Sequence, residues 1–406
     1  MDDTAANLPD FTDLQTAINS VADGDVLLLK TGTYPRMEVI GKSLTIVADA
    51  GEFPVVDASP QFGVRARVSS IGPSQALRIQ GVQFRETGPE PVVELTDSAG
   101  NIWLENCTIQ GIDFSTAVQV YRCASVVLLG VTASGGAAGA GGCTAFGSPA
   151  GAGLTVADSS ISCYGCTFAG GDGGWNLRRC DFFDKCSDWG GAEGVSSYSS
   201  STYLMLSACS ITGGDSPGSY LPCDLVGGSP NRGGIGLMAY GGSANVLECL
   251  LAGGQGVGGV GSPYVGTPTF LPGRALRVTP GSPVRENQSA HVHLEGPSSV
   301  PVWMAMSPEP DTLPAINLLR GTALLSLSPV PKVRFLGVTS AMGILDMNIP
   351  VGVLPAGTDA RLTFAQFYYL ESPTLPGGHF ALLQPPASKV FVLGGAILTP
   401  TLDEAF

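Results

Sequence analysis

The sequence predicts an all-β chain in which a solenoid of stacked coils precedes a smaller β-sandwich. The first observation is a motif that closes a short apolar run and opens a glycine-rich loop. Its copies span 106–111, 165–171, 208–214 and 248–254, and a fifth at 130–136 has valine in place of the cysteine. Recurrence at a period of 24 to 43 residues is typical of a solenoid. The other observations are a helical stripe near the N-terminus and a change of pattern near residue 280.

Composition excludes several classes of function. Charged residues make up 13% of the chain and apolar residues 44%, which suits a well-buried core. With a formal net charge of −14 and no run rich in Lys or Arg, nucleic acid is not expected as a partner. No apolar run reaches the length needed for a transmembrane segment.

The N-terminal residues carry neither a basic segment nor an apolar one. Either the protein is cytosolic or a signal peptide has been removed from this sequence. Ten cysteines lie between Cys107 and Cys249, and many of them fall in expected loops. Loop cysteines are usually bridged in secreted proteins, so a secreted or cell-surface location is expected.

The first 50 residues predict a cap and a first coil. Apolar residues at 11, 14, 17, 18 and 21 form a helical stripe, with Thr12 as a plausible N-cap and Gln15 completing a capping box. Residues 23–25 end this helix, and 26–29 form a buried strand. A solenoid needs such a cap because its open end would expose core and unpaired backbone.

The run from Asp13 to Ile18, continued by 23–26, 32–34 and 41–46, resembles the opening of right-handed parallel β-helix proteins of the pectin-lyase-like superfamily. The repeats extend this resemblance to about residue 280. It implies a right-handed parallel β-helix over 1–280 with an N-terminal helical cap. The superfamily includes polysaccharide lyases, hydrolases, esterases, adhesins and non-catalytic surface proteins, so the fold leaves the function open.

Each later coil is expected to contain two strands. The first strands are 93–95, 118–120, 154–156, 194–196, 237–239 and 276–278, and the second strands end at the cysteine motif. Like positions of a parallel solenoid stack at the strand spacing, which predicts a buried ladder of cysteines beside an Ile/Phe/Leu ladder. Stacked thiols are misaligned for a disulfide and pack as small hydrophobes. The expected core thiols are Cys107, Cys163, Cys166, Cys209 and Cys249.

The other five cysteines are expected in turns or loops, as disulfide candidates: Cys123, Cys143, Cys180, Cys186 and Cys223. Because five is odd, one of them is free or pairs with a core cysteine, and the sequence leaves the connectivity open.

Four glycine-rich insertions follow the same point of successive coils, at 135–153, 170–194, 213–234 and 253–273. They are expected to emerge on one side and to lie over one another, where insertions often build a binding surface.

Residues 281–406 predict a β-sandwich. Six or more short alternating runs, separated by turn residues, fall within this stretch. It resembles the C-terminal sandwich modules of secreted bacterial proteins. Such a module could cap the open end of the solenoid, bind a partner, or do both.

The second insertion holds the only charged cluster. Its candidate binding residues are Trp175, Arg178, Arg179, Asp181, Asp184, Asp188 and Trp189. Carboxylates beside Arg suit acid–base chemistry or a calcium site, and the tryptophans could stack on sugar rings. A disulfide-tied, salt-bridged loop explains the same residues. The paired-aspartate and histidine–glycine motifs of the family's hydrolases are absent.

Two further motifs are better explained without function. His291 and His293 share one face of a strand, as two metal ligands might, but a solvated strand face accounts for them, and His379 stands apart. Cys163 and Cys166 have CxxC spacing, but the repeat places both in the core and no second ligand pair matches it. No metal site is predicted, and calcium is the one cofactor left open.

The sequence therefore favours a secreted or cell-surface protein with a structural, adhesive or glycan-binding role. The alternative is a carbohydrate-active enzyme, either a polysaccharide lyase or a glycoside hydrolase. Expected partners are a polysaccharide or another surface protein, including a second copy of the chain.

Overall fold

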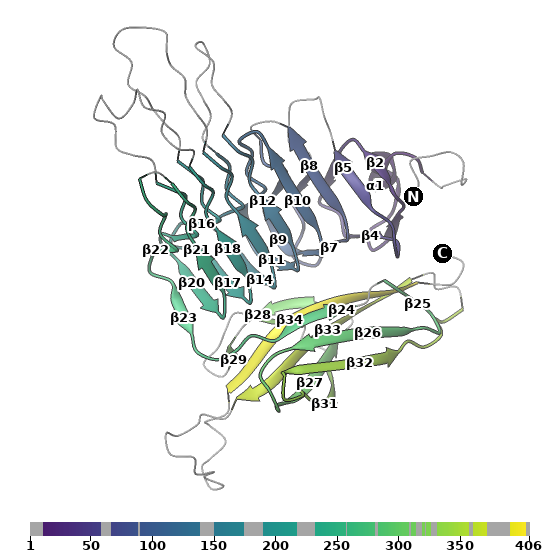
Figure 1. Ribbon diagram of the computed structural model, residues 1–406. Coiled ribbons are helices and arrows are strands. Elements are labelled where there is room, and N and C mark those ends of the chain that lie inside the picture. The colour runs from purple at the N-terminus through teal and green to yellow at the C-terminus, as the bar shows by residue number, and fades with distance from the viewer. Residues whose placement is uncertain are drawn as a thin grey trace, which may run out of the picture.

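A computed structural model describes most of the chain. The described residues are 11–57, 66–87, 90–138, 150–173, 190–216, 232–256, 258–280, 283–307, 310–313, 319–320, 322–325, 331–356, 360–371 and 390–402. Within these ranges the chain is built from strands, long parallel sheets and one α-helix (Figure 1). The expected all-β class is confirmed.

Helix α1 (Leu14–Ser20) covers the first strands of the parallel sheets. Its apolar stripe points into the core, where Leu14 and Ala17 are fully buried. The N-cap is Asp13, whose carboxylate accepts a hydrogen bond from the backbone N–H of Thr16 at 2.7 Å. The expected cap, Thr12, was therefore wrong by one residue. A carboxylate is an equally good acceptor for the unpaired N–H groups of a first turn.

The larger parallel sheet has 15 strands. Its main path is β1 (Val26–Leu29), β4 (Leu44–Ala48), β7 (Ala76–Gln80), β9 (Val93–Glu105), β11 (Val118–Leu129), β13 (Leu154–Ala157), β16 (Val195–Tyr198), β19 (Leu237–Ala239) and β22 (Tyr264–Gly266). Off this path lie β3 (Met37–Ile40), β6 (Ala66–Ser69), β14 (Ser160–Tyr164), β17 (Tyr203–Ser207), β20 (Ser243–Leu247) and β23 (Thr269–Leu271).

The second parallel sheet has eight strands, one from each successive pass of the chain. It runs β2 (Gly32–Tyr34), β5 (Pro54–Asp57), β8 (Gln83–Thr87), β10 (Thr108–Ile112), β12 (Thr132–Ser134), β15 (Thr167–Ala169), β18 (Ser210–Thr212) and β21 (Leu250–Ala252).

The register of the repeat is confirmed. The apolar residue two positions after each motif cysteine, or after the valine of the fifth copy, belongs to one ladder through the second sheet. Its members in order are Ile109, Ala133, Phe168, Ile211 and Leu251. A parallel ladder runs through Leu104, Leu128, Cys163, Leu206 and Val246. All these side chains are buried except that of Leu251, which is half-buried. The spacing of like residues along the chain thus sets the stacking of the core.

The core cysteines lie where the repeat predicts. Cys107, Cys163, Cys166 and Cys209 are free thiols, each at most 2% exposed, and Cys249 is free and half-buried. Cys123 differs from the expectation, because it lies inside strand β11 rather than in a turn, 1% exposed and with a free thiol. The remaining disulfide candidates, Cys143, Cys180, Cys186 and Cys223, lie outside the described residues.

One strand assignment was wrong. The sequence predicted that 276–278 is the strand that follows 237–239 in the larger sheet. In the structure the strand that pairs with β19 at that position is β22. Together with β23 it lies inside the stretch 253–273 that the sequence suggested was a loop insertion. Both strands are three residues long and flanked by Gly and Pro, so their pattern is that of a loop.

From residue 277 onward most pairing is antiparallel. A three-stranded sheet has the order β24 (Arg277–Pro280), β26 (Ser289–Glu295) and β32 (Ile344–Pro350). A six-stranded sheet contains β25 (Val284–Arg285), β34 (Val390–Leu402), β33 (Ala360–Glu371), β27 (Pro301–Ser307) and β31 (Lys332–Val338), with β29 (Leu319–Arg320) beside β34. A two-stranded sheet pairs β28 (Pro310–Leu313) with β30 (Ala323–Leu325).

The C-terminal strands lie alongside the larger parallel sheet and cover its outer face (Figure 1). Outward-facing Trp103 packs edge-on against Phe364, with ring centroids 5.6 Å apart. Near the first strands, both carboxylate oxygens of Asp49 accept hydrogen bonds from Arg285 at 3.2 Å. The sequence left open whether this segment caps the open end of the solenoid, binds a partner, or does both. Its described strands cover the side of the parallel sheets.

Candidate functional site

The residues that the sequence singled out for binding all belong to the second insertion. Trp175, Arg178, Arg179, Asp181, Asp184, Asp188 and Trp189 lie outside the described residues. The bases of the four insertions include described residues, and these bases stack on one another. A single line of backbone hydrogen bonds, which we call the glycine ladder, joins the outgoing and returning limbs of successive insertions.

In the glycine ladder each N–H donates to the carbonyl of the preceding member. The members in order are Ser115, Gly136, Gly151, Gly171, Ala192, Gly214, Gly234, Gly254 and Gly261. A Cβ atom on Gly171 would lie 2.0 Å from the carbonyl oxygen of Gly136, so the limbs approach too closely for any side chain there. The insertions therefore leave the parallel sheets side by side, and the close approach of their limbs requires glycine at positions such as Gly171.

A second line of residues follows the opposite edge of the same strands. Each pass contains one residue with a positive φ angle, at which the chain turns outward. This residue lies four positions after the first inward-facing residue of the strand, as Asp97 does after Val93. Register places these corner residues directly above one another, in the order Gly41, Ser70, Asp97, Arg122, Asp158, Ser199 and Gly241. A left-handed backbone is uncommon outside glycine, so these non-glycine residues stand out.

The polar corner side chains form two hydrogen-bonded groups on neighbouring strands. Arg122 Nε lies 2.5 Å from Asp97 Oδ1 in an exposed ion pair. On the next pass the carboxylate of Asp158 accepts hydrogen bonds from the hydroxyl groups of Ser199 and Ser201. The contacts hold these side chains in a row at the surface.

These contacts also favour the charged form of each group. The hydrogen bond from Arg122 lowers the pKa of Asp97, and those from Ser199 and then Ser201 lower the pKa of Asp158. The hydrogen bond to Asp97 raises the pKa of Arg122 above its usual value. At neutral pH the row therefore presents two carboxylates and one guanidinium, all ionised.

Tyrosines occupy the position before the corner residue in three passes. Tyr121, Tyr198 and Tyr240 all point outward, and Tyr198 and Tyr240 are 41% and 49% exposed. The guanidinium of Arg122 lies over the ring of Tyr121, 4.1 Å from its centroid. We call these tyrosines, together with Asp97, Arg122, Asp158, Ser199 and Ser201, the corner surface.

A shallow hollow of about 470 Å³ opens on the corner surface. Asp97, Arg122 and Asp158 line it, together with Ser98, Ala99, Cys123 and Ala124. Glu193, at the described base of the second insertion, acts on Tyr198 of the corner surface through its charge. Partial burial raises the pKa of the Tyr198 hydroxyl, and the negative charge of Glu193 raises it further. The corner surface and the second insertion thus flank the same strands.

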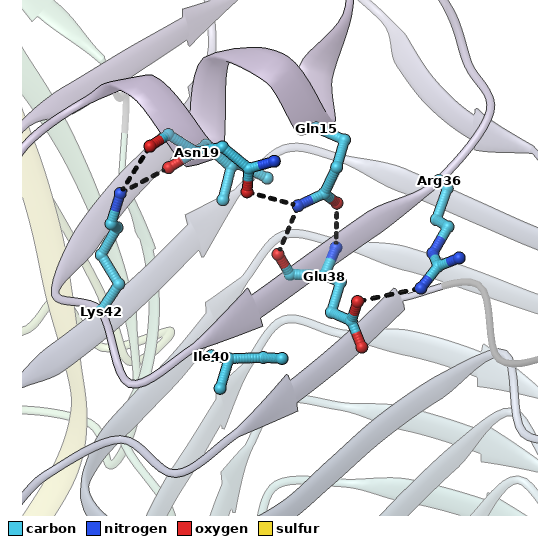
Figure 2. A pocket seen from close by; sticks show the side chains of 7 residues that line it. Gln15, Asn19, Arg36, Glu38, Ile40 and Lys42 are labelled. Atoms are coloured by element: carbon cyan, nitrogen blue, oxygen red, sulfur yellow. Dashed lines mark hydrogen bonds and ion pairs between the residues drawn. The ribbon is translucent and has the colours of Figure 1, made fainter.

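A second hollow, of about 430 Å³, lies between α1 and β3 (Figure 2). Its polar groups are bound to one another. Gln15 exchanges two hydrogen bonds with the backbone of Glu38, and Lys42 Nζ donates to the carbonyls of Ile18 and Val21 at 2.7 Å, at the end of α1. These contacts fasten the helix to the sheet, so this hollow is structural.

The two histidines lie on the exposed face of β26. His293 Nδ1 is 2.5 Å from Asp346 Oδ1 and Nε2 is 3.2 Å from Glu295 Oε1, whereas His291 Nε2 is 3.9 Å from Asp346. The carboxylates of Asp346 and then Glu295 raise the pKa of His293 and favour its charged form, which does not ligate metal. Among the described residues no group of His, Cys, Asp or Glu could hold a metal ion.

Sequence reasoning missed the corner surface. Its signal is a polar residue four positions after the first inward residue of the strands at Val93, Val118, Leu154 and Val195. Starting the fourth of these strands at Gly194 shifted that repeat by one residue and hid the alignment. His379 lies outside the described residues, and the CxxC pair is buried in the core as expected.

The chain matches no known protein-family model and no curated protein sequence. Within its described residues, no helix is both long and apolar enough to cross a membrane. The function has to be inferred from the surface chemistry of the chain.

Proposed function

We propose that this protein is a secreted or cell-surface glycan-binding protein. In this proposal the two parallel sheets wind as a right-handed parallel β-helix of the pectin-lyase-like kind, and residues 281–406 form an attached β-sandwich. The parallel register over many passes supports the winding, and the packing of two antiparallel sheets supports the sandwich.

The row of exposed tyrosines beside ionised carboxylates and a guanidinium carries the proposal. A sugar ring has an apolar C–H face and a rim of hydroxyl groups. Tyr198 and Tyr240 offer exposed aromatic faces on neighbouring strands, and Asp97, Arg122 and Asp158 offer planar acceptors and donors at the same edge. Aromatic and arginine side chains dominate the energetics of binding surfaces.

The strand spacing suits an extended ligand. Neighbouring parallel strands lie about 4.8 Å apart, so the row repeats its contacts along the sheet rather than converging on one point. This arrangement fits successive units of a linear polysaccharide. The described base of the second insertion leaves the opposite edge of the same strands, and in sequence this insertion carries Trp175 and Trp189.

The same electrostatics argue against catalysis at the corner surface. A glycoside hydrolase needs one carboxyl group whose pKa is raised so that it can donate a proton. Asp97 and Asp158 both have lowered pKa values, and Arg122 has a raised one that removes it as a base. The carbohydrate-active enzyme is therefore the second candidate.

Affinity electrophoresis through gels that contain neutral or acidic polysaccharides tests the proposal. We expect one class of polysaccharide to retard the wild-type protein. Tyr198→Ala and Tyr240→Ala are each expected to weaken binding about tenfold, or about 1.4 kcal/mol. Both rings are exposed, so thermal unfolding of either variant should match wild type.

Phe53→Ala and Arg36→Gln are the matched controls. Phe53 is an exposed aromatic residue away from the corner surface, and Arg36 is exposed and paired with Glu38, as Arg122 is with Asp97. Both controls should bind as wild type does, whereas Arg122→Gln should bind more weakly. Equal losses in test and control variants would refute this location. Release of reducing ends or unsaturated products from the bound glycan would favour the enzyme instead.

A further inference from the structure

The two ends of the parallel sheets differ in how completely their core is covered. At the first end α1 covers the core, and its inward residues Leu14, Ala17 and Ile18 are at most 2% exposed. At the last end the core ladder remains partly open. Ile211 is fully buried, but the next member, Leu251, is half-buried, as is Cys249.

The last strands also leave their backbone edges open. Strands β21, β22 and β23 end their sheet paths, and among the described residues no strand pairs with their outer edges. Figure 1 shows the three at one end of the parallel sheets. Side chains around this end are apolar and exposed: Leu250 is 66% exposed, Val260 60%, Tyr264 43% and Phe270 51%. The rings of Tyr264 and Phe270 contact each other with centroids 5.1 Å apart.

This end lacks the usual protection of a sheet edge. Exposed edges normally carry charged side chains or Pro, which discourage pairing with another chain. From Cys249 to Gly273 the sequence has no Asp, Glu, Lys, Arg or His, although charged residues make up 13% of the whole chain. The three prolines that adjoin β22 and β23, Pro263, Pro268 and Pro272, lie outside both strands.

We propose that this end, the open edge formed by β21, β22 and β23, is a dimer interface that binds the same end of a second copy. A chain of net charge −14 repels its own copy over most of its surface, and the stretch 249–273 is free of that repulsion. An apolar, uncharged patch is complementary to itself, as a two-fold interface requires. The edges supply backbone N–H and C=O groups, which would pair antiparallel across the two-fold axis.

The capped end decides between a closed dimer and a filament. Head-to-tail stacking would place the open edge against α1, whose exposed side chains, those of Thr16, Asn19 and Ser20, are polar. A helix has no strand edge to pair with. In a tail-to-tail dimer the open edge of each copy pairs with that of the other, and no open edge remains for a third copy. The assembly therefore closes at two copies.

Sedimentation velocity of the full chain over a wide dilution series tests the proposal. Wild type is expected to dissociate from dimer to monomer on dilution. Phe270→Glu places two like charges in the interface, one from each copy, and should raise the dimer dissociation constant at least about a hundredfold. Leu250→Lys is a second, independent variant. Both residues are exposed, so the circular dichroism spectrum of each variant should remain that of wild type.

Met342→Glu is the control, because Met342 is an apolar residue 84% exposed on the loop before β32. It should leave the dimer intact. Alkylation of Cys249 gives an independent readout, since its rate should rise as wild type is diluted to monomer. Three results would overturn the proposal: a monomer at every concentration, a dimer unchanged in Phe270→Glu and Leu250→Lys, or growth into species larger than two copies.

Discussion

The hydroxyl group of Tyr164 is bonded to both backbone polar groups of Thr322, 158 residues further along the chain. It accepts from the N–H of Thr322 at 3.0 Å and donates to the carbonyl at 3.2 Å. Ser162, two residues earlier on β14, donates to the Thr322 hydroxyl at 2.7 Å. These buried contacts join the larger parallel sheet to the C-terminal strands, and the sequence offers no sign of them.

Tyr164→Phe should destabilise the protein by about 2 kcal/mol, because it leaves the buried N–H of Thr322 without its partner. The Thr322 carbonyl keeps its bond from Gln366 Nε2 at 2.8 Å, so it adds little to the loss. Urea unfolding monitored by fluorescence measures the change. Tyr240→Phe, at an exposed tyrosine, should change stability by less than about 0.5 kcal/mol. Equal stability of Tyr164→Phe and wild type would mean that the contact contributes nothing.

Gly171→Ala should destabilise the protein by about 3 kcal/mol, because the added methyl group would lie 2.0 Å from the carbonyl oxygen of Gly136. The insertion limbs must move apart and the glycine ladder must break locally. Thermal unfolding measures the effect. Gly352→Ala is the control, since a Cβ there meets nothing within 4 Å. A variant as stable as the control would show that the limbs are loosely held.

The buried thiols should resist alkylation in the native protein. Burial raises the pKa of Cys107 to about 12 and that of Cys123 to about 11, so neither forms the reactive thiolate at neutral pH. Iodoacetamide followed by peptide mass mapping should modify Cys249 before Cys107, Cys123, Cys163, Cys166 or Cys209, because Cys249 is half-buried and the other five are at most 2% exposed. The hydrogen bond with Cys209 raises the pKa of Cys249 as well, so its reaction should still be slow. After unfolding without reductant, all six should react. Absence of free thiols among them would contradict the core ladder.

Asp49→Asn should lower stability by about 2 kcal/mol at neutral pH, because Lys30 and Arg285 both bind this carboxylate. Burial acts to raise the pKa of Asp49, but the hydrogen bond from Lys30, that from the Ala50 N–H and the two positive charges outweigh it, so the pKa falls below its usual 3.8. A carboxyl group with a lowered folded-state pKa stabilises the protein above the unfolded value and loses that contribution as pH falls through the folded value.

The difference between Asp49→Asn and wild type should therefore be full above pH 3.8 and shrink below it. Urea unfolding of both proteins at neutral and acidic pH measures this. Glu38→Gln, in the exposed pair with Arg36, is the matched control and should show a small effect at either pH. A stability gap that stays constant into strong acid would contradict the assignment.

The repeat in the sequence predicts the stacked core because inward residues recur at fixed places. Cys107, Cys166 and Cys209 share one position, and their register in the structure follows directly from aligning the motif. The helix at the first end could be predicted for a similar reason, since its apolar stripe is local. The short strands at the other end, β22 and β23, escaped prediction because the pairing that makes them strands comes from neighbours elsewhere in the chain.

The contacts on the outer faces of the strands depend on packing between distant segments rather than on the repeat. Ile102, Trp103 and Leu104 form one continuous apolar run, and such a run indicates burial on both faces without naming what covers the outer one. The identity of that cover, including Phe364, depends on a packing contact between segments far apart in sequence. The corner surface arises in the same way. Asp97, Arg122 and Asp158 are isolated polar residues along the chain, and stacking at the strand spacing brings them into one row. Periodicity of the chain thus encodes what faces inward, whereas the groups that gather on the outside depend on which segments fold against one another.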